Sequence, residues 1–137
     1  MRYLISAFFL TLLFVACQEK KARYIDKDEK ITSLSFDKII YSFDTIKQGE
    51  KVNITFEISN TGTEDLQIEK ALATCGCTVP NWPKQAIKPG EKGTMYVVFD
   101  SNKKRGVQNK VITVFANTIK GKEEVRLKGF VKTEINQ

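Results

Sequence analysis

The chain has 137 residues and carries 22 Lys or Arg side chains against 16 Asp or Glu, which gives a formal net charge of +6. This length suits a single domain. The sequence contains no histidine, which excludes Ser-His-Asp triads, Cys-His pairs, histidine general bases and histidine-ligated metals. Only Asp, Glu, Lys and Cys remain for catalysis, and no grouping of them resembles an active site. We therefore expect a protein that is not an enzyme.

The N-terminal segment predicts export. Its start is basic, with Arg2, and residues 3–16 carry no charge. This apolar stretch is shorter than the ~20 residues of a membrane-spanning helix, and a short apolar core behind a basic start is typical of a secretory signal. The end of the stretch, Phe14-Val15-Ala16-Cys17, resembles the lipobox of bacterial lipoproteins, which usually has Leu where Phe14 stands. The resemblance implies a signal peptide over residues 1–16, cleavage before Cys17 and acyl chains on that cysteine; a plain secretory signal and an uncleaved anchor are the alternatives.

A lipid anchor on Cys17 would hold the protein on a membrane, since each buried CH₂ contributes about 0.8 kcal/mol. Gln18 follows the cysteine, and the sorting rule of bacterial lipoproteins then implies the outer membrane rather than the inner one. Residues 17–30 are polar, and we interpret them as a lipid-anchored flexible tether. We expect a cell-envelope protein whose contact with the membrane is made through the acyl chains on Cys17.

The basic charge does not indicate nucleic-acid binding. The cations are mostly lysine, they are dispersed along the chain, and the protein is expected to be exported. We interpret them as a solvated surface, with a weak attraction to anionic lipid or polysaccharide as the alternative.

From Ile31 onward the sequence alternates between apolar and polar residues in short segments separated by turns, which is typical of strands. The clearest alternation covers residues 51–60, and Asn60-Thr61-Gly62-Thr63 closes it with a turn. A second turn is expected at Pro89-Gly90. The predicted strands, in chain order, lie at residues 34–36, 39–43, 51–60, from 66 onward, 94–99, 110–116 and 125–131.

These strands predict an all-β fold, an immunoglobulin-like β-sandwich of seven to eight strands over residues 31–137. The apolar positions of the alternating segments should form its core. The predicted core residues are Phe36, Phe43, Val52, Ile54, Phe56, Ile58, Leu66, Ile68, Val97, Phe99, Ile112, Val114, Val125 and Leu127.

One motif, Thr74-Cys75-Gly76-Cys77-Thr78, could carry chemistry, and it continues into Val79-Pro80-Asn81-Trp82-Pro83. The two prolines near Trp82 predict an extended loop of fixed shape. A disulfide between Cys75 and Cys77 would need a bent backbone, which Gly76 permits. So small a ring restrains the unfolded chain by only about 1.6 kcal/mol, so stability alone does not explain the spacing. We expect the two thiols to lie close together beside Trp82, at one end of the sandwich.

These features together resemble the bacterial domain-of-unknown-function 1573 family. The motifs typical of this family correspond to Cys75-Gly76-Cys77-Thr78, Trp82 and Pro89-Gly90-Glu91 in this sequence. The similarity covers roughly residues 39–131. At Asp44, where the family often has Gly, the chain differs. The resemblance implies an exported lipoprotein with an immunoglobulin-like fold similar to the ASH and major-sperm-protein domains; the activity of the family is not established.

Three interpretations of Cys75 and Cys77 remain open. In the first, which we favour, the pair shapes the loop in reduced or oxidised form. In the second, the pair is a thiol redox site. In the third, two thiolates bind a soft metal ion such as copper, whereas zinc would need further ligands from Asp or Glu. We expect no resident cofactor.

The leading functional hypothesis is a lipid-anchored, non-enzymatic binding or scaffold domain, because immunoglobulin-like sandwiches use loops and sheet edges to hold proteins or glycans. An envelope protein or glycan is the expected partner. The alternative is a redox or metal-handling accessory protein centred on Cys75 and Cys77. In a third hypothesis, Trp82 anchors the contact with a larger envelope complex.

Overall fold

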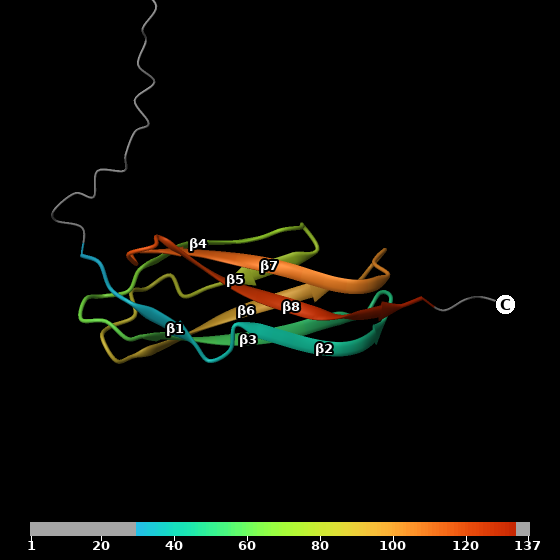
Figure 1. Cartoon of the computed structure of the whole chain (residues 1–137), viewed down its shortest axis with the longest axis horizontal. Helices are drawn as coiled ribbons and strands as arrows, with labels where there is room; N and C mark the ends of the chain where they lie inside the picture. Colours follow the sequence, from blue (N-terminus) through green and yellow to red (C-terminus); the bar gives the residue numbers. More distant parts are fainter. Residues whose placement is uncertain (1–29, 134–137) are drawn as a thin grey trace, which may run out of the picture.

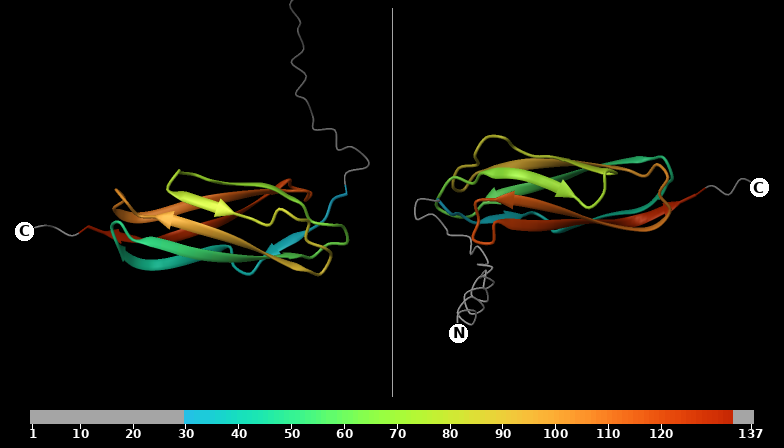
Figure 2. Two further views of the ribbon diagram at one scale, coloured as in Figure 1. Left: turned by 180° about the vertical axis from the view of Figure 1, so that it is seen from behind. Right: turned by 90° about the horizontal axis from the view of Figure 1, so that it is seen from above.

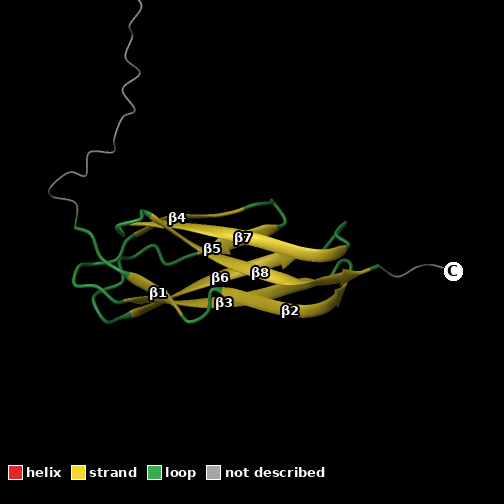
Figure 3. Ribbon diagram, in the orientation of Figure 1, coloured by secondary structure: helices red, strands yellow, loops and turns green. Residues whose placement is uncertain are grey.

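The computed structural model describes residues 30–133, which form two four-stranded β-sheets packed face to face (Figure 1) and contain strands and loops without a helix (Figure 3). The all-β, immunoglobulin-like prediction is therefore confirmed. The strands are β1 (Leu34–Phe36), β2 (Ile40–Lys47), β3 (Lys51–Asn60), β4 (Ile68–Ala73), β5 (Thr78–Asn81), β6 (Lys92–Asp100), β7 (Gly106–Ala116) and β8 (Lys122–Lys132). Within this range there is no helix that could cross a bilayer. The predicted signal peptide, Cys17 and the tether up to residue 29 lie outside the described residues.

The two sheets have the strand orders β1-β3-β6-β5 and β2-β8-β7-β4. All pairs are antiparallel except β2 and β8, which run parallel. The chain changes sheet at each connection from β1 to β5, and again between β6 and β7. The crossing from β4 to β5 contains the Cys75-Gly76-Cys77 motif, so the fold places this motif where the edge strands of the two sheets meet.

The core lies between the sheets and agrees closely with the predicted alternation. Of the predicted residues, Phe36 and Val52 are only partly buried, and the other twelve are buried. Phe36 lies on the short edge strand β1, where it packs edge-to-face on Phe56 with the ring centroids 6.5 Å apart. The core also includes residues that the prediction did not contain: Ala71, Ile87, Met95, Ala116 and Val131.

The strand β5 was not predicted, because the prolines around Trp82 indicated a loop. The register explains how Pro80 fits into a strand. The Asp100 amide donates to the Cys77 carbonyl at 2.8 Å, so Val79 and Asn81 bond toward β6 and the Pro80 nitrogen faces the outer edge of the sheet. A proline is tolerated there because no ladder hydrogen bond is lost.

The backbone conformation of Asp44 explains why the family often has glycine at this position. Asp44 lies in an irregularity of β2 between Ser42 and Thr45, and its φ is 51°. This left-handed conformation is natural for glycine and strained for most other residues, although aspartate tolerates it better than most. The predicted turn at Pro89-Gly90 is also confirmed. Gly90 has a φ of 77°, a conformation that glycine accepts in tight turns.

The described chain enters and leaves at opposite ends of the sandwich (Figure 2). Near residue 30, Thr32 bridges to Thr118 and the Asn117 side chain donates to the Lys30 carbonyl at 2.7 Å. At the far end β8 finishes beside Gly106, which pairs with Val131. The β4–β5 crossing lies in the half of the sandwich away from residue 30 (Figure 1).

Candidate functional site

The Cys75-Gly76-Cys77 segment is fixed at both ends by backbone hydrogen bonds. The Thr74 amide donates to the Val111 carbonyl of β7 at 3.0 Å, and Cys77 accepts from Asp100 of β6 at 2.8 Å. Within the segment, the Thr78 amide donates to the Cys75 carbonyl at 3.3 Å. The segment is thus a tight turn held by both sheets.

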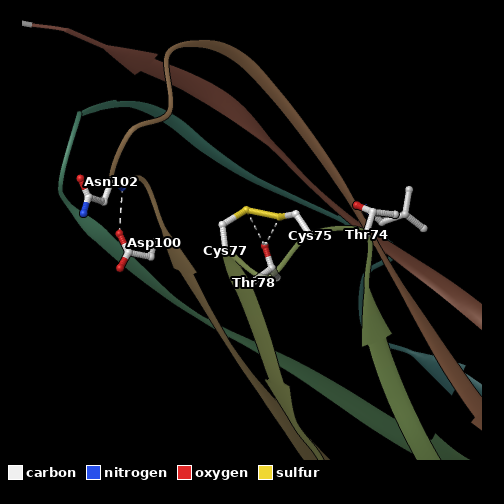
Figure 4. Close-up of a disulfide and its surroundings, with 7 residues drawn as sticks. Thr74, Cys75, Cys77, Thr78, Asp100 and Asn102 are labelled. Atoms are coloured by element: carbon white, nitrogen blue, oxygen red, sulfur yellow. Dashed lines mark hydrogen bonds between the residues drawn. A yellow bond between two sulfur atoms is a disulfide. The ribbon is translucent and has the colours of Figure 1, made fainter.

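Cys75 and Cys77 form a disulfide, with their Cα atoms 5.3 Å apart (Figure 4). The Thr78 hydroxyl lies 3.7 Å from the Cys75 sulfur and 3.9 Å from the Cys77 sulfur. Because a disulfide sulfur carries no hydrogen, the hydroxyl is the donor in both contacts. Thr78 is only 3% exposed, whereas both cysteines are half-buried and Gly76 is exposed. The bond is therefore within reach of a partner on one side and supported by a buried hydroxyl on the other.

The bend at Gly76 does not use a conformation reserved for glycine. Gly76 is not among the glycines with positive φ, and a Cβ built at this position would meet no atom within 4 Å other than those of its two neighbours in the chain. Neither backbone conformation nor space therefore demands glycine here.

Because Cys75 and Cys77 form a disulfide, neither has a free thiol group that could bind a metal ion. Between residues 30 and 133 no group of three or more Cys, Asp or Glu side chains is arranged to hold a metal ion. Metal binding would thus require reduction of the disulfide and two thiolates acting without a third ligand from this part of the chain.

Trp82 does not lie beside the disulfide, so that expectation is wrong. The cysteines precede β5 and Trp82 follows it, and the length of the strand separates them. The Trp82 ring packs against the core, and the Lys84 ammonium lies 3.2 Å from its centroid. Its indole Nε1 is buried without a hydrogen-bond partner. The role of Trp82 as an interface anchor remains a prediction.

A patch of exposed apolar side chains that the sequence motif does not predict lies next to the disulfide. Val79 of β5 pairs directly with Val98 of β6, and Tyr96 follows two residues along the same face. These side chains are 62%, 36% and 58% exposed, respectively. We call Val79, Tyr96 and Val98 the β5–β6 patch. The sequence held part of the signal, since Tyr96 and Val98 occupy the solvent-facing positions of an alternating strand.

The outer edge of β5 offers no free backbone donor. The register places the nitrogen atoms of Thr78 and Pro80 on this edge. The Thr78 amide is already bonded to Cys75, and proline has no N–H. Addition of a partner strand at this edge is therefore disfavoured, and recognition here would use side chains.

The outer face of the β1-β3-β6-β5 sheet is electrically balanced. The Lys92 ammonium lies 2.7 Å from the Glu57 carboxylate, and this hydrogen bond raises the pKa of Lys92. Lys51 pairs with Asp100 at 3.8 Å. Beside this face, burial would raise the pKa of Asp37, but the hydrogen bond from the Glu57 amide and the neighbouring Lys38 lower it overall. The β5–β6 patch is thus bordered by paired charges.

The fold and the disulfide-closed crossing define a small immunoglobulin-like sandwich domain. The chain belongs to the family described as "Protein of unknown function (DUF1573)", whose profile matches residues 34–131. The comparison with curated proteins found no match.

Solved structures support the fold. A protein of unknown function from Porphyromonas gingivalis W83 aligns with a TM-score of 0.64 and 14% identity over 73% of this chain, which corresponds to only 47% of that longer chain. The ASH/PapD-like domain 7 of human CEP192 aligns with a TM-score of 0.61 and 16% identity, over 77% of this chain and 89% of that one. The Escherichia coli chaperone DraB aligns with a TM-score of 0.53 and 10% identity, over 76% of this chain and 56% of that one. At these identities the similarity concerns the fold alone.

Proposed function

We propose that this protein is a lipid-anchored component of the bacterial cell envelope whose sandwich domain binds another envelope component without catalysing a reaction. The observation that carries the proposal is the β5–β6 patch. Exposed clusters of valine and tyrosine on a soluble surface are typical of interaction sites, because their burial by a partner removes apolar area from water.

The surroundings of the patch favour a protein partner over a glycan. The neighbouring charges are paired, and the β5 edge lacks a free donor, so contacts on this face depend on apolar side chains. The hydrogen bond from the Asp100 amide to the Cys77 carbonyl fixes the start of β5 and therefore holds Val79 in place. A rigid patch loses little conformational entropy on binding.

The test is capture of the lipidated protein from its own membrane after crosslinking. The patch variant is Val79→Thr with Val98→Thr, which keeps branched side chains suited to strands. The matched control is Ile119→Thr, because Ile119 is 82% exposed in the turn between β7 and β8, away from the patch. A specific partner should be lost from the patch variant and kept by the control. Equal capture by both variants would contradict the proposal.

A second candidate function is thiol–disulfide exchange at Cys75 and Cys77, favoured by the accessible disulfide and its Thr78 contacts. A thiolate of a partner dithiol would attack one sulfur and release the other as a thiolate, which the Thr78 hydroxyl would stabilise. The second partner thiol would then complete the exchange. The partner dithiol is oxidised to a disulfide, and its two protons end on Cys75 and Cys77.

Redox titration against a dithiol distinguishes this candidate. Rapid, reversible reduction that slows in Thr78→Val would support it. A disulfide that resists reduction in the folded protein would leave only the binding function.

A further inference from the structure

The two outer faces of the sandwich differ in charge. On the β1-β3-β6-β5 sheet, Lys51 and Lys92 are each paired with a carboxylate. On the β2-β8-β7-β4 sheet, the register places a series of cations on the outward side. They are Lys70, Lys122, Arg126, Lys128 and Lys132. We call this outward side the basic face.

Acidic groups balance few of these cations. The one carboxylate that the register puts on the basic face is Glu124, and it is paired with Arg126 at 3.5 Å. Asp44 and Glu69 lie in the irregularities of the two edge strands. Among residues 30–133, no carboxylate lies within salt-bridge distance of Lys128 or Lys132. The face therefore carries a concentrated positive charge.

Exposed apolar side chains stand between the cations. Val107 is 81% exposed and lies opposite Phe130, which is 43% exposed. Leu72 on β4 is 53% exposed, and Ile40 pairs with Arg126 at the other edge. The Lys70 ammonium lies 4.5 Å from the centroid of the Phe115 ring. Cations mixed with aliphatic and aromatic groups are the composition of surfaces that rest at a membrane interface.

We propose that the basic face docks on anionic lipid headgroups, so that the domain lies flat on the bilayer and turns the β5–β6 patch outward. The charge of the face complements an anionic surface, and a four-stranded sheet provides a broad area rather than a groove. The two sheets face opposite ways, so docking of one leaves the other free.

The domain can meet the bilayer in this way only if acyl chains at Cys17 anchor the protein. This inference therefore rests on the proposed function. The fourteen residues from Cys17 to residue 30 are joined by thirteen peptide bonds and can span at most about 45 Å when extended. The eleven residues of β8 measure about 36 Å. The chain between the anchor and the domain is thus long enough for the whole face to meet the bilayer.

The experiment uses the mature, acylated protein in vesicles of phosphatidylcholine alone and of phosphatidylcholine with phosphatidylglycerol. Amine labelling followed by mass spectrometry measures the reactivity of Lys70 and Lys128 on the basic face and of Lys51 and Lys92 on the other sheet. In the anionic vesicles, labelling of the basic-face lysines should fall about fivefold, and added salt should restore it. Lys51 and Lys92 should react equally in both vesicles.

Two variants separate charge from folding. Arg126→Glu should restore Lys128 labelling in anionic vesicles, whereas Lys51→Glu, with the same change in charge on the opposite sheet, should not. Flotation with neutral vesicles reports the acyl anchor independently, so loss of the anchor and loss of face docking give different results. Unchanged labelling of Lys128 in anionic vesicles, or protection by an acidic polysaccharide but not by these vesicles, would overturn the proposal.

Discussion

Removing the disulfide tests whether it serves stability or function. The double substitution Cys75→Ser with Cys77→Ser opens a ring of three residues, and the chain-entropy relation assigns about 1.6 kcal/mol to that ring. The surrounding hydrogen bonds from Thr74 to Val111 and from Asp100 to Cys77 do not involve the side chains that are changed. The turn should therefore keep its position without the bond.

For a domain of about 100 residues, this loss corresponds to a decrease in melting temperature of about 10 °C or less. Thermal unfolding followed by circular dichroism provides the measurement, and reduced wild-type protein is the matched control, because it lacks the bond but keeps both cysteines. A decrease well beyond 15 °C in both samples would refute the entropy argument. It would make the disulfide a structural element and remove the redox and metal interpretations.

Further predictions follow from single residues. Mass spectrometry of the mature N-terminus should find a diacyl- or triacyl-cysteine at Cys17, and an unmodified terminus elsewhere would contradict the anchor. Phe56→Ala, at a fully buried position, should lower the free energy of unfolding by about 3–5 kcal/mol. Thr55→Ala, on the opposite face, should cost far less, and equal losses in urea titrations would mean that the register is wrong. Asp44→Gly should raise the free energy of unfolding by up to about 1 kcal/mol, since glycine accepts the φ of 51° freely, and a decrease would argue against strain there. Because the pKa of Asp37 is lowered from 3.8 in the folded state, its carboxylate adds stability above about pH 4 that is lost as the pH falls further. The difference in stability between wild type and Asp37→Asn should therefore be small at pH 6 and shrink toward pH 3.

The sequence alone determined the strand pattern and most of the core. Residues such as Ile54, Phe56 and Ile58 alternate strictly with polar neighbours, and this period of two has one solution, a strand with one buried face. The short spacing between such segments then requires two sheets, because a single sheet would leave these apolar faces in water. The family motif also marked Cys75 and Cys77 before any contact was known.

Tertiary structure decided what local pattern could not. Whether Pro80 breaks a strand depends on which edge of the sheet its nitrogen faces, and that is set by pairing with β6. The separation of Trp82 from the disulfide follows from the same strand. The charges on the two faces are likewise dispersed in the sequence, and only the register between distant strands pairs Lys92 with Glu57 and leaves Lys128 without an acidic partner among the described residues. Such contacts join residues far apart in the chain, and local periodicity carries no information about which of them meet.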